Sequence, residues 1–300
     1  MIKKTVCVFI ALFGVYAVVL PCCSSRWWAN SSQHQWDGNM VRAQDFIYSD
    51  DYLPDNVIVG SSLSRRLVMD RLPNTYNLSF DGLSIFDGLK ILTHASKFPK
   101  HLFIEMNVVL RPESSEFTSS VSSPIMYYPR KVLLPLRAGK QPIAILGHIL
   151  AGRFEKLLTA LHSRFATGRK GPEAGTEVID NPKFSMSLNL QIESYSKMPT
   201  QGCLDNSFQS LKSRVDVMVS NGVEVIFFEM PVNSQLEESP MAKVIREGFY
   251  NTFPTNEYRY ILLPAKLDYV TSDGIHLNNE EALEYTTYFK VEAGNCFGSN

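Results

Sequence analysis

The sequence lacks any marked excess of charge of one sign. Its 300 residues include 29 Lys and Arg against 30 Asp and Glu, which gives a formal net charge of −1. A balance of this kind does not suit a nucleic-acid-binding surface, which is usually basic. The chain also has no internal repeat of solenoid or propeller length and no Gly-rich phosphate loop. We therefore expect a globular protein with no nucleic-acid partner.

Cysteine is scarce as well. Five cysteines are too few for a secreted disulfide framework, and three of them lie in or beside an apolar N-terminal run. Only Cys203 and Cys296 are left to pair, and their spacing leaves open whether they meet. No Cys/His spacing suits zinc, and no acidic ladder suits calcium. We expect neither a metal ion nor another cofactor.

The most distinctive feature of the sequence is an apolar run near its N-terminus. Lys3 and Lys4 precede nineteen residues without charge, Thr5–Cys23. This length nearly matches the ~20 residues that a membrane-spanning helix needs, and the lysine pair favours a cytoplasmic N-terminus. We assign residues 1–25 to a membrane anchor, with the rest of the chain outside the cytoplasm. A cleaved signal peptide and a lipoprotein signal are the alternatives.

The remaining chain is divided by its hydrophobic pattern. Residues 26–55 are polar and rich in tryptophan, which is typical of an interfacial stalk. Apolar segments then alternate with helical patterns over residues 56–300, except in a region at about 111–200 that we interpret as an insertion with one amphipathic helix at 143–165. Strands are expected at 56–60, 76–80, 101–106, 223–230 and 258–263, and helices at 62–72, 83–98, 206–220, 241–253 and from 278.

Strands that are apolar throughout and are each followed by a helix indicate a parallel sheet covered on both faces. We therefore expect an α/β fold with three layers, α/β/α, and a mainly parallel sheet of the flavodoxin-like kind. Ligands in such folds bind beyond the carboxyl ends of the strands.

The first expected strand ends in "NVIVGSS", which places Gly60, Ser61 and Ser62 at a turn before the next expected helix. Glycine permits a tight turn, and a serine at a helix N-terminus lies near N–H groups that favour developing negative charge. Acyl transfer needs a hydroxyl in this setting. A serine is also a common helix cap, so the tripeptide alone does not decide between the two roles.

A second polar motif, "TSDGIHLNNEEA", lies between the last expected strand and the last helix. It contains His276, the one histidine of six that lies in a turn of this kind, and Asp273 precedes it by three residues. A serine nucleophile needs a base, and a carboxylate within the same turn would orient the imidazole. A solvent-exposed Asp-Gly turn is the alternative.

The two motifs occur in the order used by the SGNH (GDSL-like) hydrolases, and the sequence resembles that family at two further positions. "NLSFDGLS" supplies Gly82 after the second expected strand, and "FIEMNVVL" supplies Asn107 after the third. The resemblance covers Val57 to about Leu283 outside the insertion. It implies a serine esterase or O-acyltransferase without metal or cofactor.

Carried over to this sequence, the resemblance implies that Ser62 is the nucleophile, His276 the general base and Asp273 the residue that orients His276. Gly82 and Asn107 would form an oxyanion hole with the N–H of Ser62. The sequence departs from the family pattern twice: Ser61 replaces the usual aspartate, and Glu105-Met-Asn stands where the family has Gly-x-Asn-Asp.

In its Gly-Ser-Ser tripeptide and N-terminal anchor, the sequence is similar to a narrower group of extracytoplasmic family members that O-acylate cell-envelope polymers. We therefore expect acyl transfer or ester hydrolysis on a cell-surface polysaccharide, beside a possible multispanning membrane O-acyltransferase. The alternatives are a lipid or small-ester esterase and a catalytically silent, glycan-binding assembly factor. Arg65 and Arg66 are expected on a solvated helix face.

Overall fold

The computed structural model describes residues 2–20, 35–48, 54–95, 97–141, 182–266 and 268–297. The chain divides into two compact units, Met1–Tyr48 with Ser120–Val178, and Ser49–Ser119 with Ile179–Asn300.

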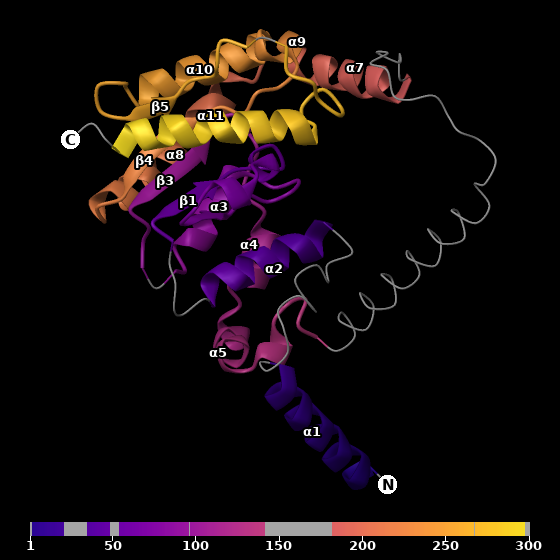
Figure 1. Ribbon diagram of the computed structural model, residues 1–300. Coiled ribbons are helices and arrows are strands. Elements are labelled where there is room, and N and C mark those ends of the chain that lie inside the picture. Colours follow the sequence, from indigo (N-terminus) through magenta and orange to yellow (C-terminus); the bar gives the residue numbers. More distant parts are fainter. Residues whose placement is uncertain are drawn as a thin grey trace, which may run out of the picture. The chain divides into compact units, whose positions relative to one another are not determined.

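The second unit is built on a parallel sheet (Figure 1). Its strands are β1 (Asn56–Val59), β2 (Thr75–Asn77), β3 (His101–Glu105), β4 (Glu224–Phe228) and β5 (Arg259–Ile261). The strand order is β2-β1-β3-β4-β5, and every neighbouring pair is parallel. All five strands predicted from the sequence are present, and the predicted parallel α/β sheet is confirmed.

The strand order fixes where a ligand should bind. The chain moves outward from β1 to β2 and then returns to β3 on the other side of β1, so the order reverses between β1 and β3. Crevices in open α/β sheets form at such a switch point, beyond the carboxyl ends of the strands. Val59 pairs with Ile104 at this place, so the residues that follow β1 and β3 lie close together.

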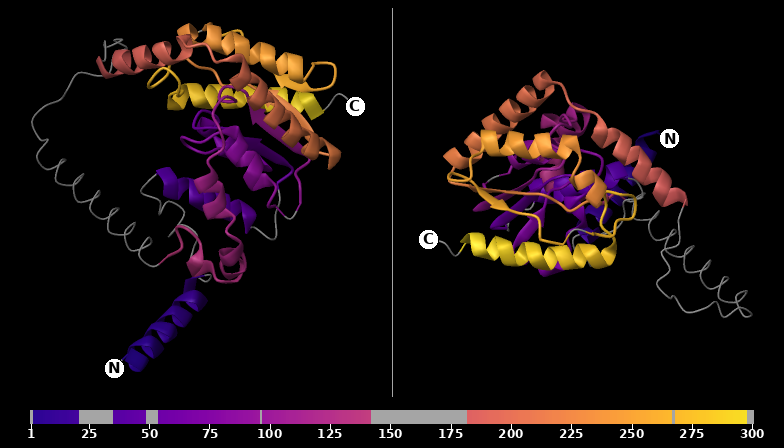
Figure 2. Two further views of the ribbon diagram at one scale, coloured as in Figure 1. Left: turned by 180° about the vertical axis from the view of Figure 1, so that it is seen from behind. Right: turned by 90° about the horizontal axis from the view of Figure 1, so that it is seen from above.

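The helices of the second unit follow the strands much as predicted. They are α3 (Ile85–Leu92), α7 (Pro182–Ser196), α8 (Gln201–Ser220), α9 (Ser234–Glu237), α10 (Pro240–Thr252) and α11 (Asn279–Phe297), while α4 (Ser115–Val121) crosses the boundary between the units. Figure 2 shows α10 and α11 from behind and from above. The helix predicted at 143–165 lies outside the described residues.

Adjacent phenylalanines of β4 contact different helices. The Phe227 ring lies 5.3 Å from that of Phe249 in α10, whereas the Phe228 ring lies 5.1 Å from that of Phe289 in α11. Successive side chains of a strand point to opposite faces. The two helices therefore contact opposite faces of β4.

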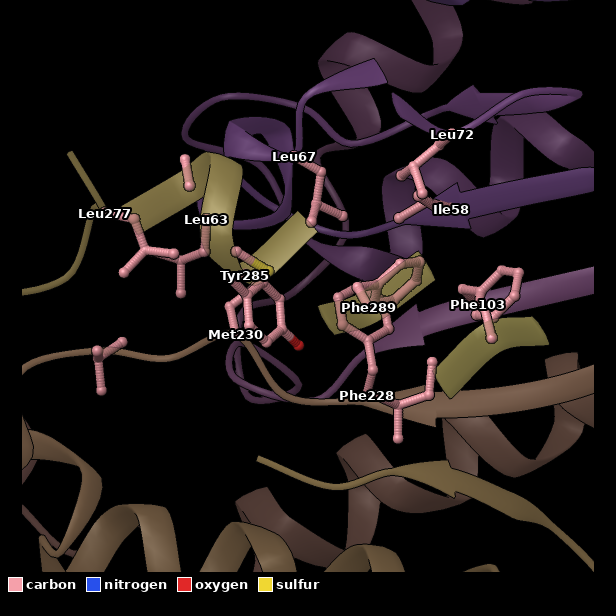
Figure 3. Close-up of a cluster of buried hydrophobic side chains, with 14 of the residues drawn as sticks. Ile58, Leu63, Leu67, Leu72, Phe103, Phe228, Met230, Leu277, Tyr285 and Phe289 are labelled. Carbon is pink, nitrogen blue, oxygen red and sulfur yellow. The ribbon is translucent and has the colours of Figure 1, made fainter. Parts of the chain in front are cut away.

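A buried cluster on the α11 face attaches both candidate motifs to the sheet (Figure 3). Leu63 and Leu67 come from the segment after β1, and Leu277 comes from the segment before α11; they pack with Phe103 and Phe289. Each of these side chains is at most 3% exposed. Burial of one such side chain contributes about 1.5–3 kcal/mol. The core therefore holds the two segments next to each other.

The helix predicted at 62–72 is wrong. The structure has two short 3-10 helices there, η3 (Ser64–Arg66) and η4 (Met69–Arg71). Leu67 separates them with an extended backbone, φ −57° and ψ 132°, and the N–H of Val68 bonds to the hydroxyl of Thr286 instead of a backbone carbonyl. The buried leucines impose this course. A three-residue helix has no useful dipole, so no helix dipole favours negative charge at Ser62.

The first unit contains α1 (Ile2–Val19), α2 (Gln35–Ile47), α5 (Pro124–Val132) and η5 (Leu134–Leu136). α1 has a mean hydropathy of 2.0 and none of it is buried, so its length and composition allow it to cross a membrane. A signal sequence would share these properties. α2 lies in the region predicted as a stalk, and it buries one face that includes Met40, Ala43 and Phe46.

The described cysteines are not paired. Cys7, Cys203 and Cys296 are free, so the structure contains no bond between Cys203 and Cys296.

Candidate active site

Ser62, His276 and Asp273 form a continuous line of hydrogen bonds. The Ser62 hydroxyl lies 2.8 Å from Nε2 of His276, and Nδ1 of the same ring lies 2.7 Å from Oδ2 of Asp273. The serine and the histidine are 214 positions apart in the chain. The two residues to which the resemblance gave the roles of nucleophile and base thus lie within hydrogen-bond distance of each other.

The turn that carries His276 is rigidly hydrogen-bonded. Oδ1 of Asp273 accepts the backbone N–H groups of His276 at 2.9 Å and Ile275 at 3.2 Å. An isolated β-bridge joins Thr271 to Leu277 at the base of the turn. The buried Gly274, at φ +98°, supplies the left-handed residue that closes it. One carboxylate therefore fixes both the backbone and the ring of His276.

The electrostatics of this turn keep Asp273 ionised. Burial raises the pKa of the carboxyl, but hydrogen bonds from the His276 backbone and ring outweigh it and hold the pKa below its usual value of 3.8. A charged carboxylate at Nδ1 holds the ring N–H on that side, which leaves the Nε2 lone pair directed at the Ser62 hydroxyl.

The turn that carries Ser62 is held by the carboxylate of Glu105, at the end of β3. Oε2 accepts the N–H groups of Ser61 at 2.9 Å and Ser64 at 3.1 Å, and Oε1 accepts the Ser61 hydroxyl at 2.7 Å. Glu105 has 0% exposure. A buried carboxylate is tolerated only where several donors surround it. Glu105 therefore fixes the turn on both sides of Ser62.

Gly60 allows this close approach. A Cβ atom at residue 60 would lie 2.5 Å from Oε2 of Glu105 and 2.0 Å from the hydroxyl of Ser64. Both atoms are buried and fixed, so no larger residue fits. The glycine that the sequence indicated as a turn residue is needed for its lack of a side chain.

The structure distinguishes the two adjacent serines. Ser61 is 1% exposed, and its hydroxyl donates to Glu105 and accepts the N–H of Leu63 at 3.2 Å. Ser62 is only partly buried and points at His276. Only Ser62 has both access to solvent and a base beside it.

Gly82 follows β2 and lies near the serine turn. The N–H of Phe80 donates to the carbonyl of Gly60 at 3.3 Å, and Arg65 forms an ion pair of 3.1 Å with Asp81. These contacts hold Phe80 and Asp81, the two residues before Gly82, next to the serine turn. Gly82 itself is exposed. Arg65 was predicted on a solvated helix face; instead it anchors this loop, while Arg66 is exposed.

Asn107 is anchored to the backbone beyond β4. Its Nδ2 donates to the carbonyl of Met230 at 2.9 Å, and its Oδ1 accepts the N–H of Met230 at 2.8 Å. This reciprocal pair fixes the plane of the amide. A primary amide has two N–H groups, and this pair uses only one of them.

A small cavity beside Asn107 is lined in part by a residue of the region predicted as an insertion. Tyr195 of α7 lines it together with Glu229 and Arg246, whose side chains form a bidentate ion pair of 2.7 and 2.8 Å. Burial, followed by the charges of Glu105 and Glu229, raises the pKa of Tyr195 to about 12. The phenol is therefore neutral and available as a hydrogen-bond donor.

Glu105 was not predicted as a site residue from the sequence. It was seen only as a departure in the "EMN" block, yet a single acidic residue at the end of the apolar strand "HLFIE" signals a buried charge that needs partners. Tyr195 gave no comparable signal.

No protein-family model matches this sequence, and no curated protein matches it. The interpretation of the site rests on its own residues and geometry. Among the described residues, no group of three His, Cys, Asp or Glu side chains is arranged to hold a metal ion.

Proposed function

We propose that this protein is a serine-dependent esterase or O-acyltransferase of the SGNH-hydrolase type. The observation that carries the proposal is the hydrogen-bonded line from Ser62 through His276 to Asp273. Ser62 and His276 are 214 positions apart in the chain, yet the three residues meet beyond the carboxyl ends of the strands.

In the first step, Ser62 Oγ attacks the carbonyl carbon of an ester while Nε2 of His276 accepts the hydroxyl proton. Asp273 stabilises the imidazolium that forms. The tetrahedral intermediate then collapses, His276 returns the proton to the leaving alcohol, and the acyl group stays on Ser62. In the second step, His276 deprotonates water or a sugar hydroxyl, which attacks the acyl-serine and releases Ser62.

The negative charge of the tetrahedral intermediate needs N–H donors. We assign this role to the N–H groups of Ser62 and Gly82 and to the second N–H of the Asn107 amide. The reciprocal bonds to Met230 support the role of Asn107, because they hold the amide in a fixed plane before substrate binds. One donor of this kind contributes about 10²–10³ in rate.

We propose a three-layer α/β/α arrangement for the catalytic unit, supported by the contacts of α10 and α11 with opposite faces of β4. We also propose that α1 is a retained membrane anchor and that the catalytic unit lies outside the cytoplasm. Lys3 and Lys4 before α1 support that orientation.

The substrate we propose is an acylated cell-surface polysaccharide, with a multispanning membrane O-acyltransferase as a possible source of acyl groups. The side chains of His276 and Asp273 are 22% and 35% exposed, and Ser62 is only partly buried. An ester on a bulky polymer could reach an open site of this kind. A lipid or small-ester esterase is the second candidate within the same chemistry.

Release of p-nitrophenol from p-nitrophenyl acetate tests the proposal on the full chain in detergent. We expect steady hydrolysis that Ser62→Ala abolishes, while Ser220→Ala, an exposed serine in α8, retains it. An added oligosaccharide should collect the acetyl group if the protein is a transferase. A folded chain that releases no p-nitrophenol above the Ser62→Ala variant would favour the assembly factor instead.

A further inference from the structure

Helix α5 of the first unit has one face that is almost fully exposed and apolar. Ile125, Tyr128 and Val132 are 84%, 73% and 79% exposed. Their spacing of three and four residues places them on one side of the helix. Isolated apolar residues are common on protein surfaces, but three together on one helix face usually mark a contact with another apolar phase.

The orientation of this face is fixed by the opposite side of α5. The Tyr127 ring packs 5.7 Å from that of Tyr48, directly after α2, and Arg130 donates from Nη1 to the carbonyl of Ser120 at 3.0 Å. These contacts hold the inner face against its own unit. The helix therefore cannot rotate to bury Ile125, Tyr128 and Val132 without breaking them.

The end of α1 contacts the segment that directly follows α5. The hydroxyl of Tyr16 donates to the carbonyl of Lys140 at 2.7 Å, and α1 packs against η5. Leu20, the residue after α1, is 3% exposed, whereas no residue of α1 itself is buried. At 1.5 Å per residue α1 is about 27 Å long, close to the ~30 Å of a bilayer core. If α1 spans the bilayer, Tyr16 lies near its outer boundary, where tyrosine is favoured.

We propose that α5 lies on the outer surface of the bilayer that α1 crosses, with Ile125, Tyr128 and Val132 inserted at the boundary between headgroups and acyl chains. The position follows from α1, because Lys140 is held at the end of α1 and only η5 and a few residues separate it from α5. Lys131, whose side chain is exposed between Tyr128 and Val132, suits anionic headgroups. This inference rests on the membrane anchor in the proposed function but not on the chemistry of the site.

Site-specific photocrosslinking in proteoliposomes tests the inference on the full chain. A benzophenone amino acid is placed at Tyr128, and at Tyr250 as a matched control, since Tyr250 is an exposed tyrosine of α10 in the other unit. A third position, Phe9 in α1, reports whether the anchor is inserted. After illumination, mass spectrometry counts phospholipid adducts at each position.

We expect lipid adducts at Phe9 and Tyr128 in comparable yield, several-fold above the yield at Tyr250. Lipid adducts at Phe9 with none at Tyr128 would overturn the inference and leave the anchor intact. Crosslinks from Tyr128 to another part of this chain or to a second copy would overturn it as well. Without lipid adducts at Phe9, both the membrane anchor and the placement of α5 on the bilayer fail. The proposed chemistry would not be affected, because ester hydrolysis tests it separately.

A charge on the same face supplies an independent test. Val132→Asp should lower the yield of lipid adducts from position 128 several-fold and leave p-nitrophenyl acetate hydrolysis unchanged. Val217→Asp, an exposed valine of α8 in the other unit, is the matched control and should leave both unchanged. Equal lipid labelling of the two variants would contradict the assignment of this face to the bilayer.

Discussion

The carboxylate of Glu105 accepts two hydrogen bonds from Ser61, one from its N–H at 2.9 Å and one from its hydroxyl at 2.7 Å. The side chain that precedes the proposed nucleophile is therefore occupied by a buried structural contact. Both Ser61 and Glu105 are positions at which the sequence departs from the SGNH pattern that was expected from its motifs. The carboxylate that holds this turn therefore comes from the neighbouring strand β3.

Replacement of Glu105 tests that relationship. Glu105→Ala leaves the N–H groups of Ser61 and Ser64 and the Ser61 hydroxyl buried without an acceptor, and each costs about 1–3 kcal/mol. We expect a large fall in the urea midpoint and loss of ester hydrolysis. Glu105→Gln keeps one oxygen for the two N–H groups and should recover most of the stability. If the alanine variant were as stable and as active as the glutamine variant, the turn would not depend on this side chain.

Gly274 gives a second prediction through its contact with α7. A Cβ at residue 274 would lie 3.0 Å from Cδ1 of Leu188, and the backbone has φ +98°. Gly274→Ala should cost about 1–2 kcal/mol for the left-handed backbone and should also displace the turn that carries His276, which lowers kcat.

Gly222→Ala is the matched control for this change. Gly222 has a similar φ of +79°, but nothing lies within 4 Å of the position that a Cβ would occupy. It should lose comparable stability in a urea titration and keep its kcat. If both variants kept full activity, the contact between α7 and the turn would not matter for the site.

The lowered pKa of Asp273 predicts how stability depends on pH. The folded chain binds the proton of the Asp273 carboxyl less tightly than the unfolded chain does. The contribution of the ionised carboxylate to the free energy of unfolding is therefore fully present above the unfolded pKa of about 3.9. It is lost as the pH falls through the lower folded pKa.

The free energy of unfolding of the wild type should therefore fall more between pH 6 and pH 3 than that of Asp273→Asn, which cannot titrate at this position. Urea titrations at the two pH values measure the difference. Identical pH dependence in the two proteins would show that Asp273 gains nothing from His276 on folding.

The sequence predicted the sheet and the two polar turns because both depend on local patterns. Uniformly apolar runs gave the five strands, and the parallel order placed their carboxyl ends at one edge. Residues 62–72 were misassigned because Leu63 and Leu67 have helical spacing, yet both pack in a core with residues such as Phe103 and Phe289, which lie more than 30 positions away in the sequence. A local pattern carries no information about such contacts.

The same reasoning explains which parts of the site could be anticipated. Ser62, Asp273 and His276 are recognisable from short motifs at strand ends. Glu105, Tyr195 and the ion pair of Arg65 with Asp81 act through partners that are distant in sequence or on another element. Their roles appear only when the strands are assembled.

Labelling with a fluorophosphonate probe tests the central claim most directly, because the probe reacts preferentially with a serine whose hydroxyl is activated by a base. The full chain in detergent is treated, digested and analysed by mass spectrometry, with Ser62→Ala, Ser61→Ala and His276→Ala alongside. We predict one adduct on Ser62, which is absent from Ser62→Ala, strongly slowed in His276→Ala and retained in Ser61→Ala. A folded wild-type chain with no adduct, or with its adduct on Ser61, would contradict the account.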